Sequence, residues 1–227
     1  MSQTFVISVG GSLVVKKEGI QTAWLKKFRQ FILREVKKGN RFYLVVGGGV
    51  TARQYIKAAK NITRVSEADC DWVGIGANRL NAHLVRAIFG TQAHPEIIID
   101  PTKKVISRKK IIIAAGYQPG WSTDYVAVLL ARTQRINKVI NLSNIDYAYN
   151  KDPRLFKDAQ KLINVAWPEF RHIVGNVWQP GTNTPFDPIA SRTAAQYRMA
   201  VAILNGVNLS NFSRYLRGQS FIGTTIK

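Results

Sequence analysis

Cysteine is almost absent from the chain, because Cys70 is the only one among 227 residues. One thiol cannot form an intramolecular disulfide, so a small secreted domain held together by disulfides is excluded. Without a second thiol there is no cysteine-based metal site, and we expect no metal held by protein ligands alone. No apolar run approaches the length of about 18 residues that spans a bilayer, and the first residues predict a strand rather than a signal peptide. A cytoplasmic protein without membrane contact is therefore expected.

Acidic residues are also scarce, since 13 Asp and Glu stand against 33 Lys and Arg and leave a net charge of +20. No acid follows Asp187. Such a surface attracts anionic partners. The basic residues are spread along the chain, with no basic tail and no basic stretch interleaved with aromatic residues, as a groove for single-stranded nucleic acid would need. Solvated helix faces are therefore favoured, and binding of nucleic acid or polyphosphate stays open as the second interpretation.

Long linkers, internal repeats and low-complexity segments are missing as well, so we expect a single domain over residues 1–227. Its 46% hydrophobic residues are enough to bury one sizeable core. Apolar runs of strand length alternate with helix-length segments, which is typical of an α/β fold with a mostly parallel sheet covered by helices on both faces. Strands are expected at 4–9, 42–46, 97–99, 111–115, 138–142 and 200–204, and helices at 22–38, around 52–59, and at 71–89.

Two glycine-rich turns stand directly after two of these expected strands. Val6–Val9 leads into Gly10-Gly11-Ser12, and Leu44–Val46 leads into Gly47-Gly48-Gly49. Glycine lets the backbone adopt positive φ and lets a ligand approach closely, so that successive N–H groups can converge on an anion at the start of the next helix. Two such turns in one chain suggest two ligands that carry phosphate.

Two further segments have the composition of ligand-binding loops. In residues 114–124, a strand runs through a turn with Gly116 and Gly120 into Ser122-Thr123-Asp124, which can cap a helix or face a phosphate or a base edge. In residues 141–153, polar side chains follow a strand and can hold an adenine or a ribose. A plain helix cap explains the first segment equally well.

The order of these segments resembles that of the archaeal-type uridylate kinases in the amino acid kinase family, over nearly the whole chain. The matching motifs are Val9–Ser12, the triple glycine followed by Ala52-Arg53 and Tyr55-Ile56, Gly74-Ile75 with Arg79 and Asn81-Ala82, Gln118–Asp124, Asn144–Pro153, Asp187-Pro188 and Gly223–Ile226. The resemblance implies a three-layer α/β/α sandwich, the amino acid kinase fold. It also implies transfer of the γ-phosphoryl group of ATP to UMP, which gives UDP in pyrimidine nucleotide biosynthesis, with Mg²⁺ carried by ATP.

Carried over position by position, the resemblance divides the candidate residues between two nucleotides. ATP would be held mainly by the part after residue 125, together with the first glycine turn, through Ser8, Val9, Gly10, Gly11, Ser12, Gly49, Arg53, Ser143, Asn144, Tyr149 and Asp152. UMP would be held mainly by residues 1–125, through Gly48, Asp71, Tyr117, Gln118, Pro119, Gly120, Trp121, Ser122 and Thr123. Asp146, Asp187 and Arg53 are the catalytic candidates, which organise and neutralise charge around the phosphates.

The chain departs from the family pattern at two positions. Many members have a lysine in the first strand that bridges the phosphates, where this chain has Ser8. Tyr147 stands where the family usually has glycine, which requires a changed backbone angle or a reshaped loop.

The family suggests a homo-oligomer, a ring-like hexamer, for which the aromatic helix near residues 24–36 is a candidate contact face.

Two other functions stay open beside UMP kinase. A related small-molecule phosphate kinase, such as one for isopentenyl phosphate, would share the ATP half of the site, although Asp71 and the polar 118–124 loop favour a nucleotide acceptor. A protein without catalysis that binds a nucleotide or nucleic acid on the same fold would fit the missing lysine and the charge of +20.

Overall fold

A seven-stranded sheet forms the centre of the molecule in the computed structural model, which describes residues 2–177 and 184–227. Its strand order is β5-β4-β1-β6-β10-β11-β9, and every neighbouring pair is parallel except β10 with β11. In chain order the strands are β1 (Thr4–Val9), β4 (Arg41–Val46), β5 (Ile111–Ala114), β6 (Lys138–Ser143), β9 (Asn164–Val165), β10 (Ala200–Asn205) and β11 (Thr224–Ile226).

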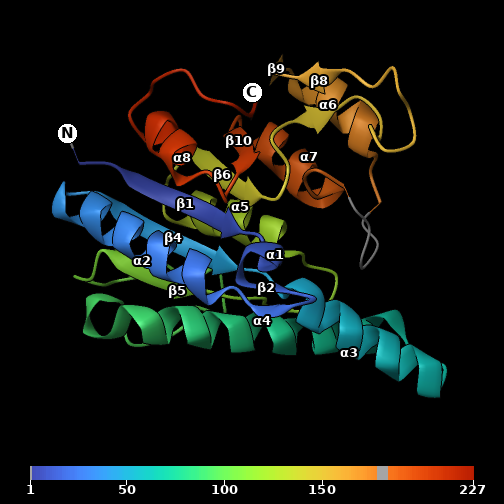
Figure 1. The fold of residues 1–227 in the computed structure, drawn as a ribbon, viewed down its shortest axis with the longest axis horizontal. Coiled ribbons are helices and arrows are strands. Elements are labelled where there is room, and N and C mark those ends of the chain that lie inside the picture. The colour runs from blue at the N-terminus through green and yellow to red at the C-terminus, as the bar shows by residue number, and fades with distance from the viewer. Residues whose placement is uncertain (1, 178–183) are drawn as a thin grey trace.

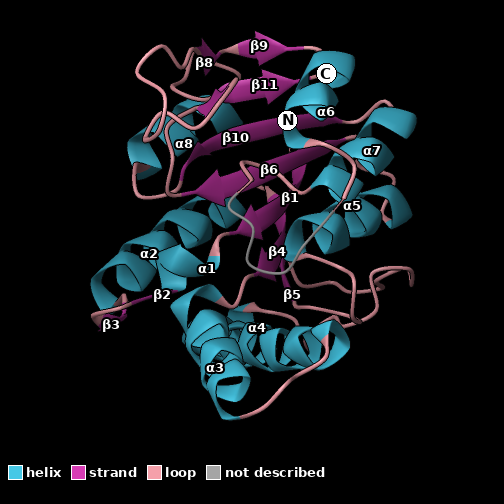
Figure 2. Cartoon of the chain, turned by 90° about the vertical axis from the view of Figure 1, so that its right-hand side faces the viewer, coloured by secondary structure: helices cyan, strands magenta, loops and turns pink. Residues whose placement is uncertain are grey.

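Helices cover both faces of this sheet, as Figures 1 and 2 show. On one face lie α2 (Thr22–Lys37), α4 (Glu67–Phe89) and α8 (Leu209–Leu216), and on the other lie α5 (Thr123–Thr133), α6 (Trp167–Val174) and α7 (Pro188–Gln196). The remaining elements are α1 (Gly11–Val14), α3 (Gly49–Ile62), a short 3₁₀ turn at Gly90–Gln92 and the two-stranded ribbons β2 (Val15–Lys16) with β3 (Gly19–Ile20) and β7 (Ala148–Tyr149) with β8 (Lys161–Leu162). Among the described residues, no helix is both long and apolar enough to cross a membrane.

The core has two halves because the central strands are buried on both faces. Ile7, Leu44 and Ile113 point to the α2, α4 and α8 side, and the alternate residues of the same strands point to the α5, α6 and α7 side. Almost every residue of β1, β4 and β6 is buried, which explains why these strands read as continuous apolar runs. The predicted three-layer architecture with a mostly parallel sheet is confirmed.

Some predicted elements differ in extent. The strand expected at 97–99 is wrong, because Ile98 forms only an isolated bridge to Ala114, between Pro95 and Pro101, which lack the N–H groups of a longer ladder. The helix expected from residue 71 begins at Glu67, since Ser66 caps it by accepting a hydrogen bond from the Asp69 N–H at 3.1 Å. The strands β9 and β11 were not predicted.

The aromatic side chains of the 24–36 helix, a candidate subunit contact, are largely used inside the chain. Phe28 and Phe31 are 0% and 3% exposed, and Phe31 packs on Phe212 of α8 in the core. Trp24 stacks on Phe28, and its indole N–H donates to the Gly206 carbonyl at 2.9 Å. A subunit contact through this helix stays a prediction and would use its exposed side chains.

The two glycine turns touch each other at the end of β1 and β4. A Cβ atom on Gly11 would lie 2.0 Å from the Gly49 nitrogen, and one on Gly49 would lie 2.4 Å from the Gly11 carbonyl oxygen. Gly49 also has φ of +64°, which L side chains rarely adopt. Both positions therefore require glycine for packing, whether or not a ligand binds there.

We predict that Gly11→Ala destabilises the protein by about 3 kcal/mol, because the backbone of α3 must move away to admit the methyl group. The matched control is Gly76→Ala in the exposed part of α4, where a Cβ meets nothing within 4 Å. Alanine there should be neutral or stabilising by up to about 1 kcal/mol, because it favours the helix. Urea unfolding of both variants checks the pair, and equal stability would contradict the packing argument.

Candidate functional site

The glycine turns lie at the edge of the sheet where the parallel strands β1, β4, β5, β6 and β10 all end, which is where ligands bind in open α/β folds. Hydrogen bonds fix the turns to neighbouring strands, because the Gly10 N–H donates to the Leu142 carbonyl at 2.8 Å and the Gly47 N–H to the Val9 carbonyl at 3.0 Å. The α3 helix then starts at Gly49 with no side-chain cap and no acid in its first turn. Its first N–H groups are suited to an anion.

Side chains of helix α4 contact the second glycine turn and hold it in place. The Asn81 amide nitrogen donates to the carbonyls of Gly47 at 2.9 Å and Gly48 at 3.1 Å, and Asn81 is only 3% exposed. Asn78 lies between Gly48 and Gly116, since Cβ atoms there would come within 2.5 and 2.7 Å of its amide. The sequence argument assigned no role to either asparagine, although an amide on a largely apolar helix face was the available signal.

The predicted UMP residues are brought together around the first half of α4. The Gly120 N–H donates to Asp71 Oδ2 at 2.7 Å, and Arg79 donates to the carbonyls of Gly116 at 3.3 Å and Tyr117 at 3.2 Å. Burial raises the pKa of Asp71, and the hydrogen bond from Gly120 partly offsets this effect. The loop from 116 to 122 is therefore held by two side chains, of which the sequence argument named only Asp71 as a site residue.

The same loop ends in an aromatic cluster and a helix cap. The Trp121 ring lies 5.2 Å from that of Tyr117 and 4.9 Å from that of Tyr125, measured between centroids. Ser122 caps α5 by accepting a hydrogen bond from the Tyr125 N–H at 3.1 Å. Its hydroxyl oxygen therefore has a structural partner, as the plain helix-cap interpretation requires.

Asp124 is the most important residue that the sequence argument left out of the site. Its Oδ1 accepts hydrogen bonds from the Ser8 hydroxyl at 2.7 Å and the Asn141 amide at 3.0 Å, and thus joins β1, β6 and α5. Burial raises the pKa of Asp124 to about 7; the Ser8 hydroxyl lowers it, and the charge of Asp187 raises it further. The signal was an acid at the first turn of an apolar helix, in a segment that the sequence predicts either to cap the helix or to face a ligand.

Asp187 lies beside Asp124 and is 3% exposed. Its Oδ1 caps α7 by accepting a hydrogen bond from the Ala190 N–H at 2.6 Å, while its Oδ2 is buried with no hydrogen-bond partner among the described residues. Burial raises its pKa, partly offset by the Ala190 N–H. Two acids in one desolvated place, one with an unpaired oxygen, form a site suited to a cation.

Asp146 lies in different surroundings from Asp187. It is exposed in the loop after β6, and its Oδ1 accepts a hydrogen bond from the Asn205 amide at 3.0 Å, at the end of β10. Within the described residues no hydrogen bond joins it to Asp187 or Asp124. The two predicted catalytic acids therefore belong to two separate groups on one edge of the sheet.

The expected adenosine residues follow in an exposed loop. Asp152 forms an ion pair with Arg154 at 2.6 Å, whose hydrogen bonds lower the pKa of Asp152 to about 2. Tyr149 lies in β7 opposite Lys161, and Ser143 and Asn144 stand at the end of β6. Tyr147 does not have positive φ, so its loop takes a shape that a side chain permits, with the Lys161 ammonium 5.2 Å from its ring centroid.

Arg53 is exposed on α3, four residues after Gly49. It has no ion pair with a carboxylate among residues 2–177 and 184–227. A cation so close to the uncapped start of α3 adds positive potential to the glycine turns.

Comparisons with known proteins agree with this geometry. The model of the amino acid kinase family matches residues 3–205. The uridylate kinase of Methanococcus maripaludis strain C7 is 33% identical over 206 residues, covering 89% of this chain and 90% of that protein. The uridylate kinase of Methanothermobacter thermautotrophicus is 32% identical over 226 residues, covering 97% of both. The crystal structure of uridylate kinase from Archaeoglobus fulgidus aligns with a TM-score of 0.83 at 29% identity, covering 98% of this chain and 99% of that one.

We predict that Asp124→Asn, which mimics the protonated acid, stabilises the nucleotide-free protein more at pH 8 than at pH 5. The pKa of Asp124 is about 7 in the folded protein and 3.8 ordinarily. Because the folded value is the higher one, the stability due to its proton is complete below pH 4 and is lost as the pH rises through 7. Allowing for partial exposure, the advantage of the variant should grow by about 2 kcal/mol from pH 5 to pH 8.

Urea unfolding at the two pH values measures this difference. Glu96→Gln, at an exposed acid, is the control and should show no comparable dependence on pH. An advantage of Asp124→Asn that is the same at pH 5 and pH 8 would show that Asp124 is ionised at both.

Proposed function

The chain belongs to the amino acid kinase family, and from that membership we propose that it is a UMP kinase, which transfers the γ-phosphoryl group of ATP to UMP and releases UDP and ADP. The relatives that support this are uridylate kinases that match the chain over nine-tenths or more of their length.

The observation that carries the proposal is the way α4 joins the two halves of the site. Asn81 holds the second glycine turn by hydrogen bonds, and Asn78 packs between that turn and Gly116. Asp71 and Arg79 hold the loop from 116 to 122. A phosphate at the glycine turns and a nucleotide at that loop would therefore lie on one rigid support. Phosphoryl transfer depends chiefly on such positioning and on charge neutralisation.

In this proposal the residues of the chain bind and orient rather than react. The turn at Gly10-Gly11, Gly49 and the start of α3 hold the ATP phosphates, with Arg53 as the nearby cation. Ser143, Asn144, Tyr149 and Asp152 hold the adenosine, and Gly48, Asp71 and residues 117–123 hold UMP. Ser8 acts through Asp124 and supplies no charge, so N–H groups, Arg53 and the cation bound to ATP must offset the repulsion between the phosphates.

Mg²⁺ accompanies ATP in this proposal, and the buried acids fit it. Asp187 Oδ2 has no hydrogen-bond partner in residues 2–177 and 184–227, and Mg²⁺ typically binds one or two carboxylates together with substrate phosphates and water. Asp187, with Asp124 beside it, would hold the ion. No group of three or more His, Cys, Asp and Glu suited to a metal occurs within the described residues. When bound, Mg²⁺ supplies positive charge between the phosphates.

The proposal has three further parts. Asp146 and Asp187 organise the transfer from two sides, Asp146 at the end of β10 and Asp187 in the buried acid pair. Residues 1–125 serve the acceptor nucleotide and residues 126–227 serve ATP. The protein works as a homo-oligomer in the cytoplasm, a hexamer by family resemblance, with any contact on α2 made by its exposed side chains.

We predict that purified protein with Mg²⁺ and ATP releases ADP fastest with UMP. At matched concentrations, CMP, AMP, TMP and isopentenyl phosphate should each give at most about a tenth of the kcat/KM, since Asp71 and the 116–122 loop form a polar acceptor site. Coupled detection of ADP measures this. A preference for isopentenyl phosphate, or binding of nucleotide without turnover of any acceptor, would overturn the proposal in favour of the other kinase or a binding protein.

We predict that Arg53→Gln lowers kcat/KM for ATP by about 10- to 100-fold, because a hydrogen bond between charged groups contributes about 1.5–3 kcal/mol. Its stability should be unchanged, since Arg53 is exposed and joins no ion pair with a described residue. Arg64→Gln, at an exposed position just beyond α3, is the matched control and should retain wild-type kinetics. Equal kinetics of the two variants would remove Arg53 from the site.

A further inference from the structure

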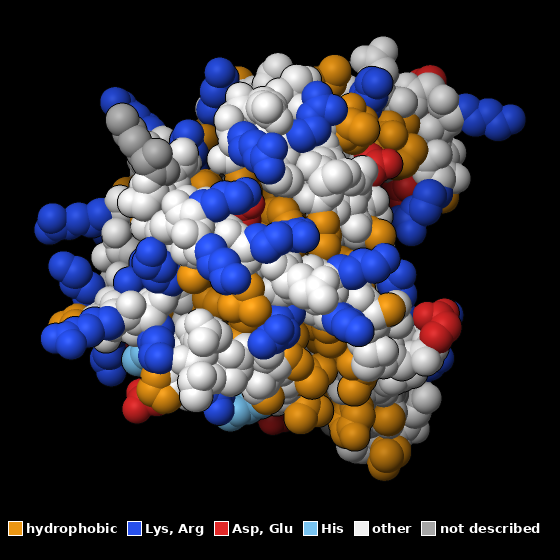
Figure 3. Space-filling model, turned by 60° about the vertical axis from the view of Figure 1, so that its left-hand side comes forward, with side chains coloured by type: hydrophobic (Ala, Val, Ile, Leu, Met, Phe, Trp, Pro, Cys, Tyr) orange, Lys and Arg blue, Asp and Glu red, His pale blue; other side chains and the backbone are white. Residues whose placement is uncertain are grey.

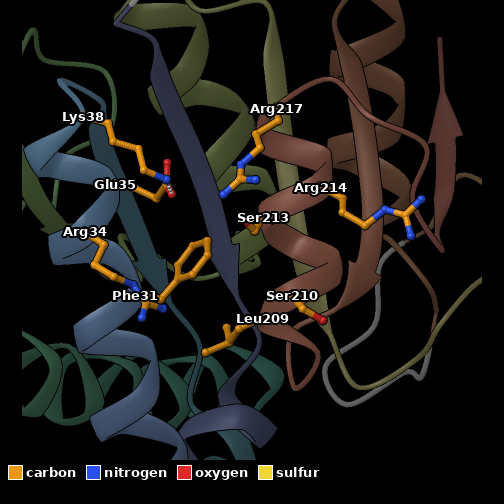
Figure 4. A pocket seen from close by; sticks show the side chains of 9 residues that line it. All are labelled: Phe31, Arg34, Glu35, Lys38, Leu209, Ser210, Ser213, Arg214 and Arg217. Carbon is orange, nitrogen blue, oxygen red and sulfur yellow. Dashed lines mark hydrogen bonds and ion pairs between the residues drawn. The ribbon is translucent and has the colours of Figure 1, made fainter.

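A groove between α2 and α8 lies apart from the site described above; it has a volume of about 480 Å³ and is about half open to solvent. One face of each helix lines it, as Figure 4 shows. Phe31 and Arg34 come from α2, with Lys38 at its C-cap, and Leu209 and Ser213 come from α8, with Arg217 at its C-cap. Lys38 precedes the start of β4, whereas the glycine turns follow its end. The Lys38 end of the groove is thus at the opposite edge of the sheet from the phosphate turns.

The bottom of the groove is fixed to the hydrophobic core. The Phe31 ring packs on the Phe212 ring with 4.9 Å between centroids, and the two residues are 3% and 0% exposed. The space between the helices is therefore set by core packing rather than by a loop, and both walls are regular helices. A ligand would meet a preformed surface here, which reduces the entropic cost of binding.

The charge of the groove is positive because its one acid is already compensated. Glu35, 4% exposed, accepts hydrogen bonds from Lys38 Nζ at 2.5 Å and from the Asn40 amide at 3.0 Å. Arg34 and Arg217 form no ion pair with any carboxylate of the described residues. In Figure 4 the Arg217 guanidinium points across the groove toward Glu35, and that of Arg34 lies beside Phe31, whereas Arg214 turns away.

Lys and Arg side chains are common on the surface of this protein, so their presence alone does not identify a binding site. Figure 3 shows a face on which Lys and Arg are scattered widely and acids are few. The groove differs because two guanidinium groups and the Ser213 hydroxyl line one hollow of ligand size, which is about half open to solvent. Guanidinium groups bind phosphate oxygens in pairs of parallel hydrogen bonds, and partial enclosure strengthens the attraction.

We propose that this groove is a second anion site, which binds the phosphate groups of a small phosphorylated molecule through Arg34 and Arg217. Its volume of about 480 Å³ lies in the range of small-molecule pockets, and this favours a small ligand over an RNA strand. The inference does not rest on the kinase activity, since neither arginine belongs to the strand-edge site.

The test is calorimetric titration of the whole protein with inorganic triphosphate, while ADP and UMP saturate the strand-edge site. We predict that Arg34→Gln with Arg217→Gln weakens this remaining binding at least about 10-fold, as expected for the loss of two charged hydrogen bonds. Lys104→Gln with Arg108→Gln removes the same charge from exposed positions outside the groove and should change the affinity less than twofold.

Titration of both double variants with ADP alone shows whether the strand-edge site is intact, and urea unfolding shows whether they are folded. Equal weakening in both variants would show that the surface attracts triphosphate by its overall charge and would overturn the proposal. Unchanged affinity after loss of both arginines would do the same, as would a single-stranded RNA that competes for the groove and binds more tightly than triphosphate.

Discussion

The packing of the whole ligand-binding edge of the sheet depends on one contact between two backbone turns, which leaves no room for a Cβ atom on either side. Gly11 and Gly49 touch directly, and Gly10 and Gly47 are hydrogen bonded to Leu142 and Val9. Strands β1, β4 and β6 can therefore end at the same level, with their turns side by side. The uncapped start of α3, the support from Asn81 and the position of the 116–122 loop all depend on this arrangement. The glycines that this close packing requires thus also expose a surface of backbone N–H groups.

Behind this surface lies an acid pair that forms no ion pair with a Lys or Arg of the part of the chain that the structure describes. Asp124 is hydrogen bonded by neutral groups, Ser8 and Asn141, and Asp187 leaves one oxygen unpaired. In a chain with a net charge of +20, this is a locally acidic place. The fold keeps both acids desolvated, which raises the pKa of each and makes a cation favourable there. The many surface cations therefore attract anions over long range, whereas the two acids bind positive charge locally.

The sequence predicted the parts of the molecule that depend on local pattern. Continuous apolar runs identified the central parallel strands, and glycines after two of them identified the turns. It missed what depends on distant residues. The short strand β11 pairs only because β10 lies beside it, and Asp124 becomes a site residue only because β1 brings Ser8 within 2.7 Å. The burial of Phe31 could not be predicted for the same reason, since nothing in the helix itself shows that α8 covers this ring. The roles assigned to Asp146, Arg53 and the adenosine loop remain predictions.

The edge of the sheet at β9 has a consequence for local opening of the structure. In the seven-stranded sheet β9 pairs only with β11, which lies about sixty residues later in the chain. β11 in turn is antiparallel to its other neighbour, β10. Since Thr224 also binds the Ala148 N–H and the Leu162 carbonyl, the same segment holds the β7–β8 ribbon. If β11 detaches, β9 and the ribbon lose their support together. We therefore expect the amide protons of residues 148, 164–165 and 224–226 to exchange as one cooperative unit, distinct from the central strands.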